Sequence, residues 1–278
     1  MVLNGMGMKS WFACYIACCA APAALFMPGM KFQPNSPHPL FGLLRHREGI
    51  QPASSLLTKQ PKLRHLRPEP TSVYQKQSIH GFTVLINPVV RTQPQASRAM
   101  QAELTAQLAA ISQVMPTKPL SALRKVWIWV EWDNREGAAE FHPSVEWLRQ
   151  HGYNPDKAGC VEISNTRNFV QWSRSNQPWM MLHELAHAYH HRVLGDANTE
   201  VQQAYHHALN QGLYQSVSYS KGPAQKAYAL TNAKEYFAEL SESYFGKNDF
   251  YPFNRTQLKT YDLRGYQLME KSWGKPRR

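Results

Sequence analysis

The sequence predicts an α+β fold, on the basis of three observations. Residues 82–86 and 125–132 form short runs rich in β-branched and aromatic side chains, which favour strands. Residues 97–112 repeat apolar side chains at helical spacing, and the second half of the chain holds further helix-like segments. We therefore expect a small mixed sheet packed on a buried helix at 177–192, followed by a helical C-terminal part.

The N-terminal residues 1–23 have the pattern of an export signal. Lys9 precedes an apolar run at 11–26, and a small-residue cleavage site follows at 21–23. The run is short for a transmembrane span, so cleaved export is the preferred interpretation, with a lipoprotein signal or an uncleaved membrane anchor as alternatives. Three of the four cysteines lie in this segment. Only Cys160 would stay in the mature chain, which excludes an intrachain disulfide and favours a packed cysteine.

Residues 24–75 are rich in Pro, Gln, Ser and basic side chains. They carry seven Lys or Arg against two Glu, and repeated prolines interrupt any long element. We expect a largely disordered linker. It accounts for part of the net charge of +12 and could favour an anionic envelope surface, although solubility alone is the preferred explanation. The chain shows no RNA-binding motif, zinc-finger spacing or helix-turn-helix pattern, so no nucleic-acid partner is expected.

The folded domain is predicted at 76–278, and its elements follow the apolar pattern. The run at 125–132 is apolar on both faces, which is typical of a central strand. A short strand at 160–164 precedes the helix at 177–192, and we expect a sheet edge there that a peptide can join. The helix at 97–112 places four apolar residues on one face: Met100, Leu104, Leu108 and Ile111. Further helices are predicted at 199–211, 232–245 and 255–261.

The helix at 177–192 carries His183-Glu184-Leu185-Ala186-His187, an H-E-x-x-H motif. Two His four residues apart stand one turn apart on the same helix face, so both imidazoles can bind one metal ion. Glu184 lies beside that ion and can take a proton from a water bound to it. The apolar flanks indicate a buried helix, where two His and a Glu would be costly without a metal. The pattern is typical of a zinc hydrolase, with one Zn²⁺ per chain.

Two His ligands require a third protein ligand. The extended metzincin pattern needs Gly at position 190 and His at 193, where the chain has His190 and Val193. Glu200 is possible, but Glu235 and Glu239 are better placed, four residues apart on a downstream helix. Glu235 can bind the metal, and Glu239 can accept the outer N–H of a ligand His. A solvated acidic helix face is the alternative interpretation of this pair.

Further histidines follow the motif along the chain. A second metal site is conceivable, but positions around the first metal or in solvent are the preferred interpretation. They are His190, His191, His206 and His207.

The segment at 228–239, with its Glu-x-x-Ala-Glu pattern, and the upstream H-E-x-x-H motif resemble the catalytic domain of the anthrax toxin lethal factor family. These proteins are zinc metallopeptidases of the gluzincin type. The resemblance covers the predicted domain and is specific at the two helices. It implies a zincin-like metalloprotease fold, with Zn²⁺ bound by His183, His187 and Glu235. It also implies that Tyr228, seven residues before that Glu, helps to stabilise the transition state. The toxin's delivery and substrate-recognition domains have no room here, so its specificity is not carried over.

These features predict an exported zinc peptidase that acts on a peptide or protein substrate. Zinc would lower the pKa of a bound water and polarise the scissile carbonyl, with Glu184 as general base and Tyr228 as a second donor to the oxyanion. Two alternatives stay open. One is an inactive zinc-binding or adhesion protein on the same fold, against which the intact Glu184 argues. The other is an amide hydrolase acting on cell-wall peptides, which the sequence does not distinguish from ordinary peptide cleavage.

Overall fold

The structure, a computed structural model, describes residues 68–277. The predicted export signal at 1–23 and most of the predicted linker at 24–75 lie outside the described residues. The end of that predicted linker belongs to the fold, because Tyr74 is buried and donates a hydrogen bond to Glu131 at 2.5 Å. Within 68–277, none of the helices has the length and apolar character that crossing a membrane requires.

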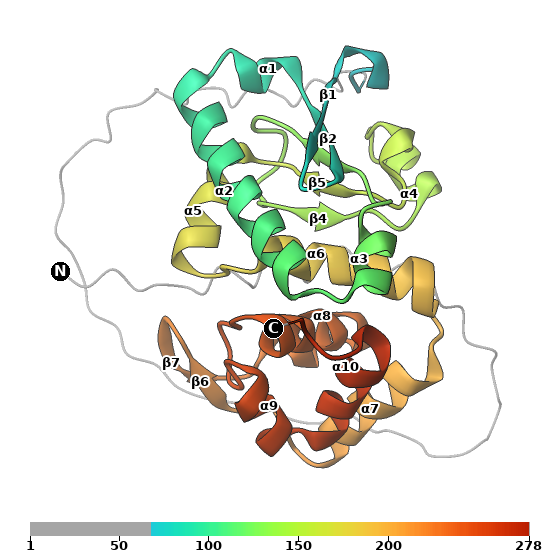
Figure 1. Cartoon of the computed structure of the whole chain (residues 1–278), viewed down its shortest axis with the longest axis vertical. Helices are drawn as coiled ribbons and strands as arrows, with labels where there is room; N and C mark the ends of the chain where they lie inside the picture. The colour runs from blue at the N-terminus through green and yellow to red at the C-terminus, as the bar shows by residue number, and fades with distance from the viewer. Residues whose placement is uncertain (1–67, 278) are drawn as a thin grey trace, which may run out of the picture. The chain divides into compact units, whose positions relative to one another are not determined.

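A five-stranded mixed sheet fills one part of the fold (Figure 1). Its order is β1-β2-β3-β5-β4, in which β2, β3 and β5 are parallel and the outer strands pair antiparallel. The strands are β1 (Gln75–Ile79), β2 (Phe82–Ile86), β3 (Ile128–Val130), β4 (Glu140–Phe141) and β5 (Val161–Ile163). Every residue of β3 is buried. The prediction of a central strand within 125–132 is therefore confirmed, although the strand is shorter than that run.

The predicted sheet edge at 160–164 is wrong. The strand exists as β5, but it pairs with β3 on one side and β4 on the other, so both of its edges are used. The edge strands of the sheet are β1 and β4, of which β4 contacts α6 (Met180–Tyr189). Two residues, Glu140 and Phe141, are too few to show the alternation by which a strand is recognised in sequence.

Alternation along the strands separates two faces of the sheet. Val84, Ile128 and Val161 point to the main core, which the apolar face of α2 (Pro94–Val114) shares. The intervening Leu85, Trp129 and Cys160 form a smaller cluster with Tyr74. Cys160 is thus a packed free cysteine, as predicted.

The helices follow the predicted periods closely. The predicted segments at 97–112 and 177–192 correspond to α2 and α6, and the segment at 177–192 also includes the start of the π-helical turn after α6. The predicted segments at 199–211, 232–245 and 255–261 correspond to α7 (Thr199–Asn210), α8 (Ala233–Phe245) and α9 (Arg255–Tyr261). Asn side chains that accept backbone N–H groups begin several of them, which is a frequent helix start. The remaining helical elements are η2 (Thr71–Val73), α1 (Pro88–Arg91), α3 (Thr117–Leu123), α4 (Val145–Gln150), η3 (Pro155–Lys157), α5 (Thr166–Ser175), the π-helical turn η4 (His190–Leu194), η5 (Tyr228–Leu230) and α10 (Leu263–Trp273).

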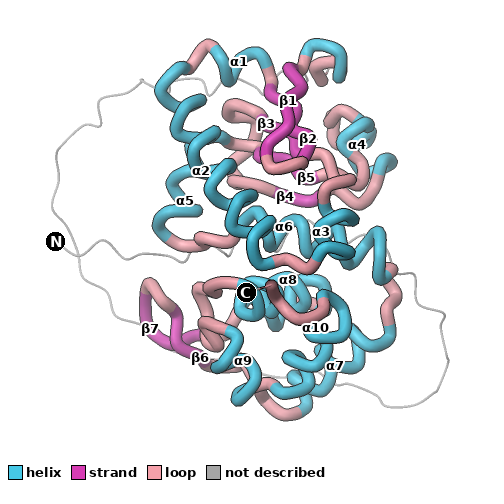
Figure 2. The backbone as a smooth tube through the Cα atoms, viewed as in Figure 1, coloured by secondary structure: helices cyan, strands magenta, loops and turns pink. Residues whose placement is uncertain are grey.

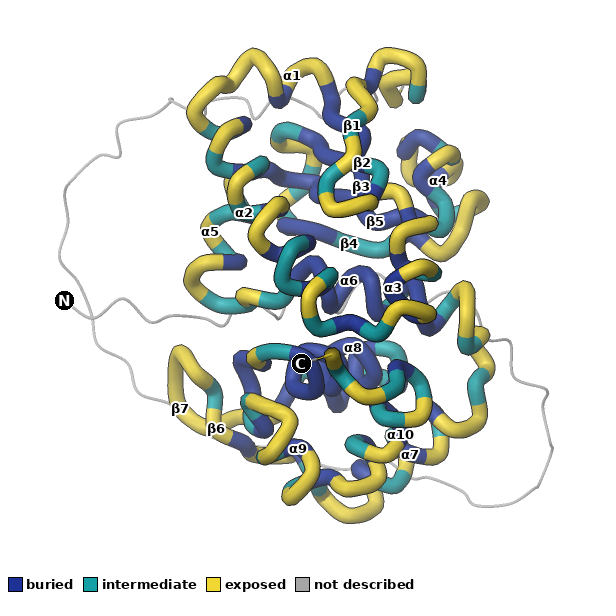
Figure 3. The backbone as a smooth tube through the Cα atoms, viewed as in Figure 1, coloured by how far each residue is buried: buried dark blue, intermediate teal, exposed yellow. Residues whose placement is uncertain are grey.

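The C-terminal part is helical and packs on α6, as expected (Figures 1 and 2). α8 (Ala233–Phe245) contacts α6, α7 (Thr199–Asn210), α9 (Arg255–Tyr261) and α10, and it is buried along nearly its whole length (Figure 3). A hairpin of β6 (Val217–Tyr219) and β7 (Gly222–Gln225) precedes η5. The described chain is thus a mixed sheet with helices, consistent with the predicted α+β class.

Candidate metal centre

α6 places the two motif histidines one turn apart. The ring centroids of His183 and His187 lie 4.9 Å apart, and both side chains are largely buried. α6 begins without a side-chain cap from its own N-terminus. Instead, Gln107 of α2 accepts the backbone N–H of Met181 at 2.9 Å. Because the first N–H groups of a helix have no partner inside it, this bond makes α2 part of the frame that holds the motif.

α8 brings Glu235 to these histidines. The Asn232 side chain accepts the backbone N–H groups of Lys234 and Glu235, at 2.9 and 3.0 Å, and so fixes the first turn of the helix. Glu235 Oε2 then lies 3.1 Å from His183 Nε2 and 3.3 Å from His187 Nε2. The structure thus brings together all three residues predicted as metal ligands.

The separations between these atoms suit a tetrahedral metal site. Two donors that each bind zinc at about 2.0 Å lie about 3.3 Å apart at the tetrahedral angle. The two Nε2–Oε2 separations, 3.1 and 3.3 Å, are close to that value. One donor atom from each of the three residues lies within 4.8 Å of the others. This buried group could therefore hold a metal ion, and two imidazole nitrogens with a carboxylate oxygen are a donor set typical of catalytic zinc.

The carboxylate and the imidazoles of this group shift one another's pKa values. Burial alone would raise the pKa of Glu235, but His187 and His183 hold that pKa well below its usual range. Burial alone would lower the pKa of His183, but hydrogen bonds to Glu235 and Glu242 raise it well above the ordinary value. A proton on His183 and a metal ion at its Nε2 are therefore alternatives, and metal binding must release the proton.

Glu184 lies next to His183 on α6 and is 5% exposed. Burial raises the pKa of Glu184 to about 7, against the opposing effect of His183 and His187. A carboxyl group that titrates near neutral pH can both accept and return a proton under physiological conditions. Its position beside the three candidate ligands is the one expected for a general base.

Tyr228 lies on η5, on the chain that leads into α8. Its ring centroid is 6.3 Å from that of His183, which places the tyrosine at the same site. Burial raises the pKa of Tyr228, and the nearby carboxylates of Glu235 and Glu184 add to the effect. The phenol therefore keeps its proton and can donate a hydrogen bond.

Glu239 does not make the predicted hydrogen bond to His183. Its Oε1 lies 3.8 Å from His183 Nδ1, beyond hydrogen-bond distance, and its Oε2 accepts from the Asn248 side chain at 3.2 Å. The hydrogen bond to His183 Nδ1 belongs to Glu242 Oε1, at 2.8 Å. The sequence held the signal, because Glu242 follows Glu235 by two helical turns and so shares its face.

The four histidines that follow the motif belong to none of the candidate metal groups found among residues 68–277. His190 is 1% exposed, and burial lowers its pKa to about 4, so it is neutral. His191 pairs with Asp196 at 2.8 Å. His206 is exposed and His207 is half-buried on α7. The preferred interpretation, positions around the first site or in solvent, agrees with these locations.

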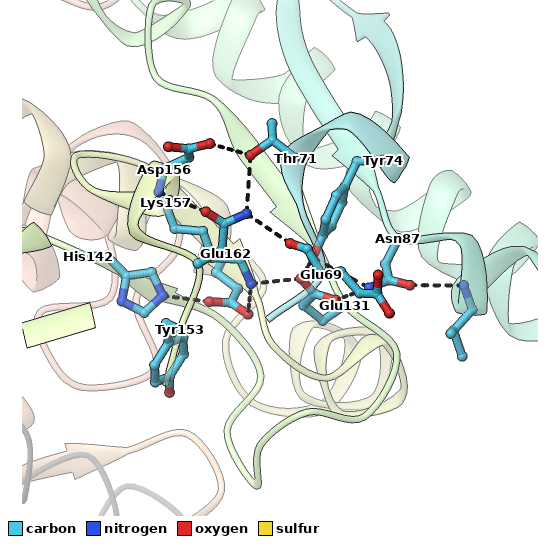
Figure 4. Close-up of polar contacts among 12 residues, drawn as sticks. Glu69, Thr71, Tyr74, Asn87, Glu131, His142, Tyr153, Asp156, Lys157 and Glu162 are labelled. Atoms are coloured by element: carbon cyan, nitrogen blue, oxygen red, sulfur yellow. Dashed lines mark hydrogen bonds and ion pairs between the residues drawn. The ribbon is translucent and has the colours of Figure 1, made fainter. Parts of the chain in front are cut away.

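The sequence analysis did not predict a second buried charged cluster (Figure 4). It lies on the face of the sheet that carries the smaller apolar cluster of Leu85, Trp129 and Cys160. Lys157 Nζ lies 2.7 Å from both Glu131 Oε1 and Glu162 Oε1. His142 Nε2 contacts Glu162 Oε2 at 2.6 Å, and Asn87 donates to Glu131 at 2.7 Å. The available signal was a charged residue directly after or inside an apolar strand run. The cluster already contains its own cation in Lys157, so it is a structural ion-pair network.

Comparison of the chain with family models, with curated proteins and with solved structures finds no match.

Proposed function

We propose that this chain is a zinc-dependent peptidase on a zincin-like architecture. The observation that carries the proposal is the convergence of His183, His187 and Glu235, in which Glu235 Oε2 lies at tetrahedral spacing from both imidazole nitrogens. Glu184 lies beside this group, and Tyr228 is nearby. The resemblance of the motif segments to the lethal factor family supports the same assignment. Export through the predicted signal at 1–23 is part of this proposal.

The residues of the site divide the reaction between them. When bound, Zn²⁺ supplies a Lewis acid that lowers the pKa of water and polarises a carbonyl. Glu184 takes the proton of the attacking water and returns it to the leaving amine. Tyr228 donates its phenolic hydrogen to the negative oxygen that develops at the scissile carbonyl. The open edge of β4, which contacts α6, offers backbone groups with which an extended peptide can pair.

The test combines metal content with peptide cleavage, for the full chain and for Glu184→Gln. We expect purified wild-type protein to hold one zinc per chain and to cleave members of a broad peptide library. Glu184→Gln should hold the same zinc but cleave at least about 100-fold more slowly, because general-base catalysis contributes about 10²–10⁴-fold. Glu235→Gln should lose zinc.

Each other outcome has a definite meaning. A wild-type protein that binds no zinc would refute the proposal. Zinc in both proteins without cleavage by either would favour the inactive binding or adhesion protein. Cleavage of cell-wall peptides but not of linear peptides would favour the amide hydrolase.

A further inference from the structure

We infer that Glu242 positions His183 for metal binding, and that Gln177 holds Glu242 in place for this task. This inference rests on the proposed zinc site. It assigns Glu242 and Gln177 a role in metal affinity that differs from the roles of Glu235, the ligand, and Glu184, the base.

The two ring nitrogens of His183 face different carboxylates. Nε2 points to Glu235 Oε2 at 3.1 Å, where the metal group converges, and Nδ1 lies 2.8 Å from Glu242 Oε1. A carboxylate oxygen accepts hydrogen bonds, so the 2.8 Å contact is the one that a proton on Nδ1 would make. In the neutral ring this leaves the lone pair on Nε2, which is the form that binds a metal through that atom.

Gln177 holds the Glu242 carboxylate by a second hydrogen bond. The same Oε1 accepts a hydrogen bond from Gln177 Nε2 at 3.0 Å. Gln177 lies just before α6, and its backbone N–H donates to Trp172 O at 2.9 Å. The hydrogen bond from Gln177 to Glu242 requires the start of α6 to lie close to the end of α8. Trp179 packs directly on Gly246 there, and a Cβ at position 246 would lie only 1.9 Å from the Trp179 ring. The hydrogen bond and this packing hold the start of α6 against the end of α8.

Glu239 offers a matched comparison on the same helix face. Glu239 and Glu242 are both 0% exposed and three residues apart. One Glu239 oxygen is hydrogen-bonded to Asn248, and the other remains 3.8 Å from His183. A Glu-to-Gln substitution removes the same charge from the same buried surroundings in either case. Only at Glu242 does it also replace the acceptor of the imidazole proton.

The environment of Glu242 ties its charge to the imidazole. Its second oxygen, Oε2, is buried without a hydrogen-bond partner among the described residues. A buried carboxylate with an unsatisfied oxygen is costly, so it depends on nearby positive charge. His183 supplies that charge when its ring is protonated or when Nε2 binds a cation. The carboxylate in turn strengthens the imidazole as a ligand.

The experiment compares zinc affinity, by chelator competition at neutral pH, in the full-length wild type, Glu242→Gln, Glu239→Gln and Gln177→Leu. We expect Glu242→Gln to lose about 10–100-fold in affinity. Gln177→Leu should lose less in the same direction, and Glu239→Gln least. A second readout is the Nδ1 proton of His183 in the zinc-loaded proteins, observed by NMR with ¹⁵N-labelled histidine. It should be downfield and slow to exchange in the wild type and in Glu239→Gln, and shifted upfield in Glu242→Gln.

The outcomes separate this inference from the proposed function. Equal losses in the two Glu-to-Gln variants, or a larger loss in Glu239→Gln, would overturn the inference while leaving the zinc site intact. A wild-type protein that binds no zinc would remove both. If Glu242→Gln does not fold, Gln177→Leu and the wild-type proton resonance decide. A wild-type His183 without a proton on Nδ1 would then refute the role of Glu242.

Discussion

Replacing Lys157 by Met tests whether the buried charged cluster supports the sheet beside α6. Its ammonium lies 2.7 Å from a carboxylate oxygen of Glu131 and 2.7 Å from one of Glu162. Both carboxylates are 0% exposed, and the lysine side chain is 4% exposed. The variant would keep both negative charges in the interior without their common cation.

The expected loss follows from this geometry. Removing one partner of a buried ion pair costs about 3–5 kcal/mol, because the remaining charge is left unpaired. The pKa of Glu162 has the direction expected of a stabilising pair. Although burial alone would raise this pKa, Lys157 and His142 lower it from 4.5 to about 2. We therefore expect the free energy of unfolding to fall by about 3–5 kcal/mol at neutral pH.

The loss should depend on pH in a defined direction. A carboxyl group whose pKa is lowered by folding stabilises the protein above its unfolded pKa, and this contribution disappears as the pH falls toward the folded value. For Glu162 the window runs from 4.5 down to about 2. In the variant, Glu131 and Glu162 lack their common cation and can take up protons at acid pH. The difference between wild type and variant should thus shrink on acidification to about pH 4.

Urea unfolding of the full-length, chelator-treated proteins, followed by tryptophan fluorescence, measures this difference. Lys271→Met is the control, since that lysine forms a surface pair with Glu200 and is 69% exposed. Such pairs contribute about 0–1 kcal/mol. A loss in Lys157→Met no larger than in Lys271→Met would refute the reasoning, as would a loss that does not change with pH.

Two further substitutions test the site. Gly246→Ala should lower the free energy of unfolding by about 1–3 kcal/mol, because its Cβ would lie 1.9 Å from the Trp179 ring. In thermal unfolding it should differ from Gly137→Ala, whose nearest neighbour would be 3.6 Å away, and equal effects would contradict the close packing. Tyr228→Phe should lower kcat about 10²-fold, with zinc content and KM little changed. Loss of zinc together with activity would instead show that this tyrosine only supports the fold.

The ligands of the candidate site could be predicted because helix geometry fixes them. His183 and His187 are one turn apart in any α-helix. Glu235 stands in the first turn of α8, the second long helix after α6. To predict that α6 and α8 lie side by side, it was enough to assume that their side chains bind the same metal ion. The helices themselves were long enough for their apolar period to be read.

The parts that could not be predicted depend on contacts between distant segments. The two-residue β4 has too little pattern to identify, although it forms one edge of the sheet. Whether Glu239 or Glu242 meets His183 is decided by the packing of α6 against α8, because both are on the right face. Lys157 looks like an ordinary surface lysine until the fold brings Glu131 and Glu162 to it.

The hydrogen bond between Gln107 and the first turn of α6 has a consequence for design. The bond joins residues 74 positions apart, and α6 has no side-chain cap of its own. A short peptide containing only the H-E-x-x-H segment would leave that backbone group open to water and its helix poorly formed. Transplanting this centre into another scaffold would thus require a substitute for the α2 glutamine as well as the three candidate ligands.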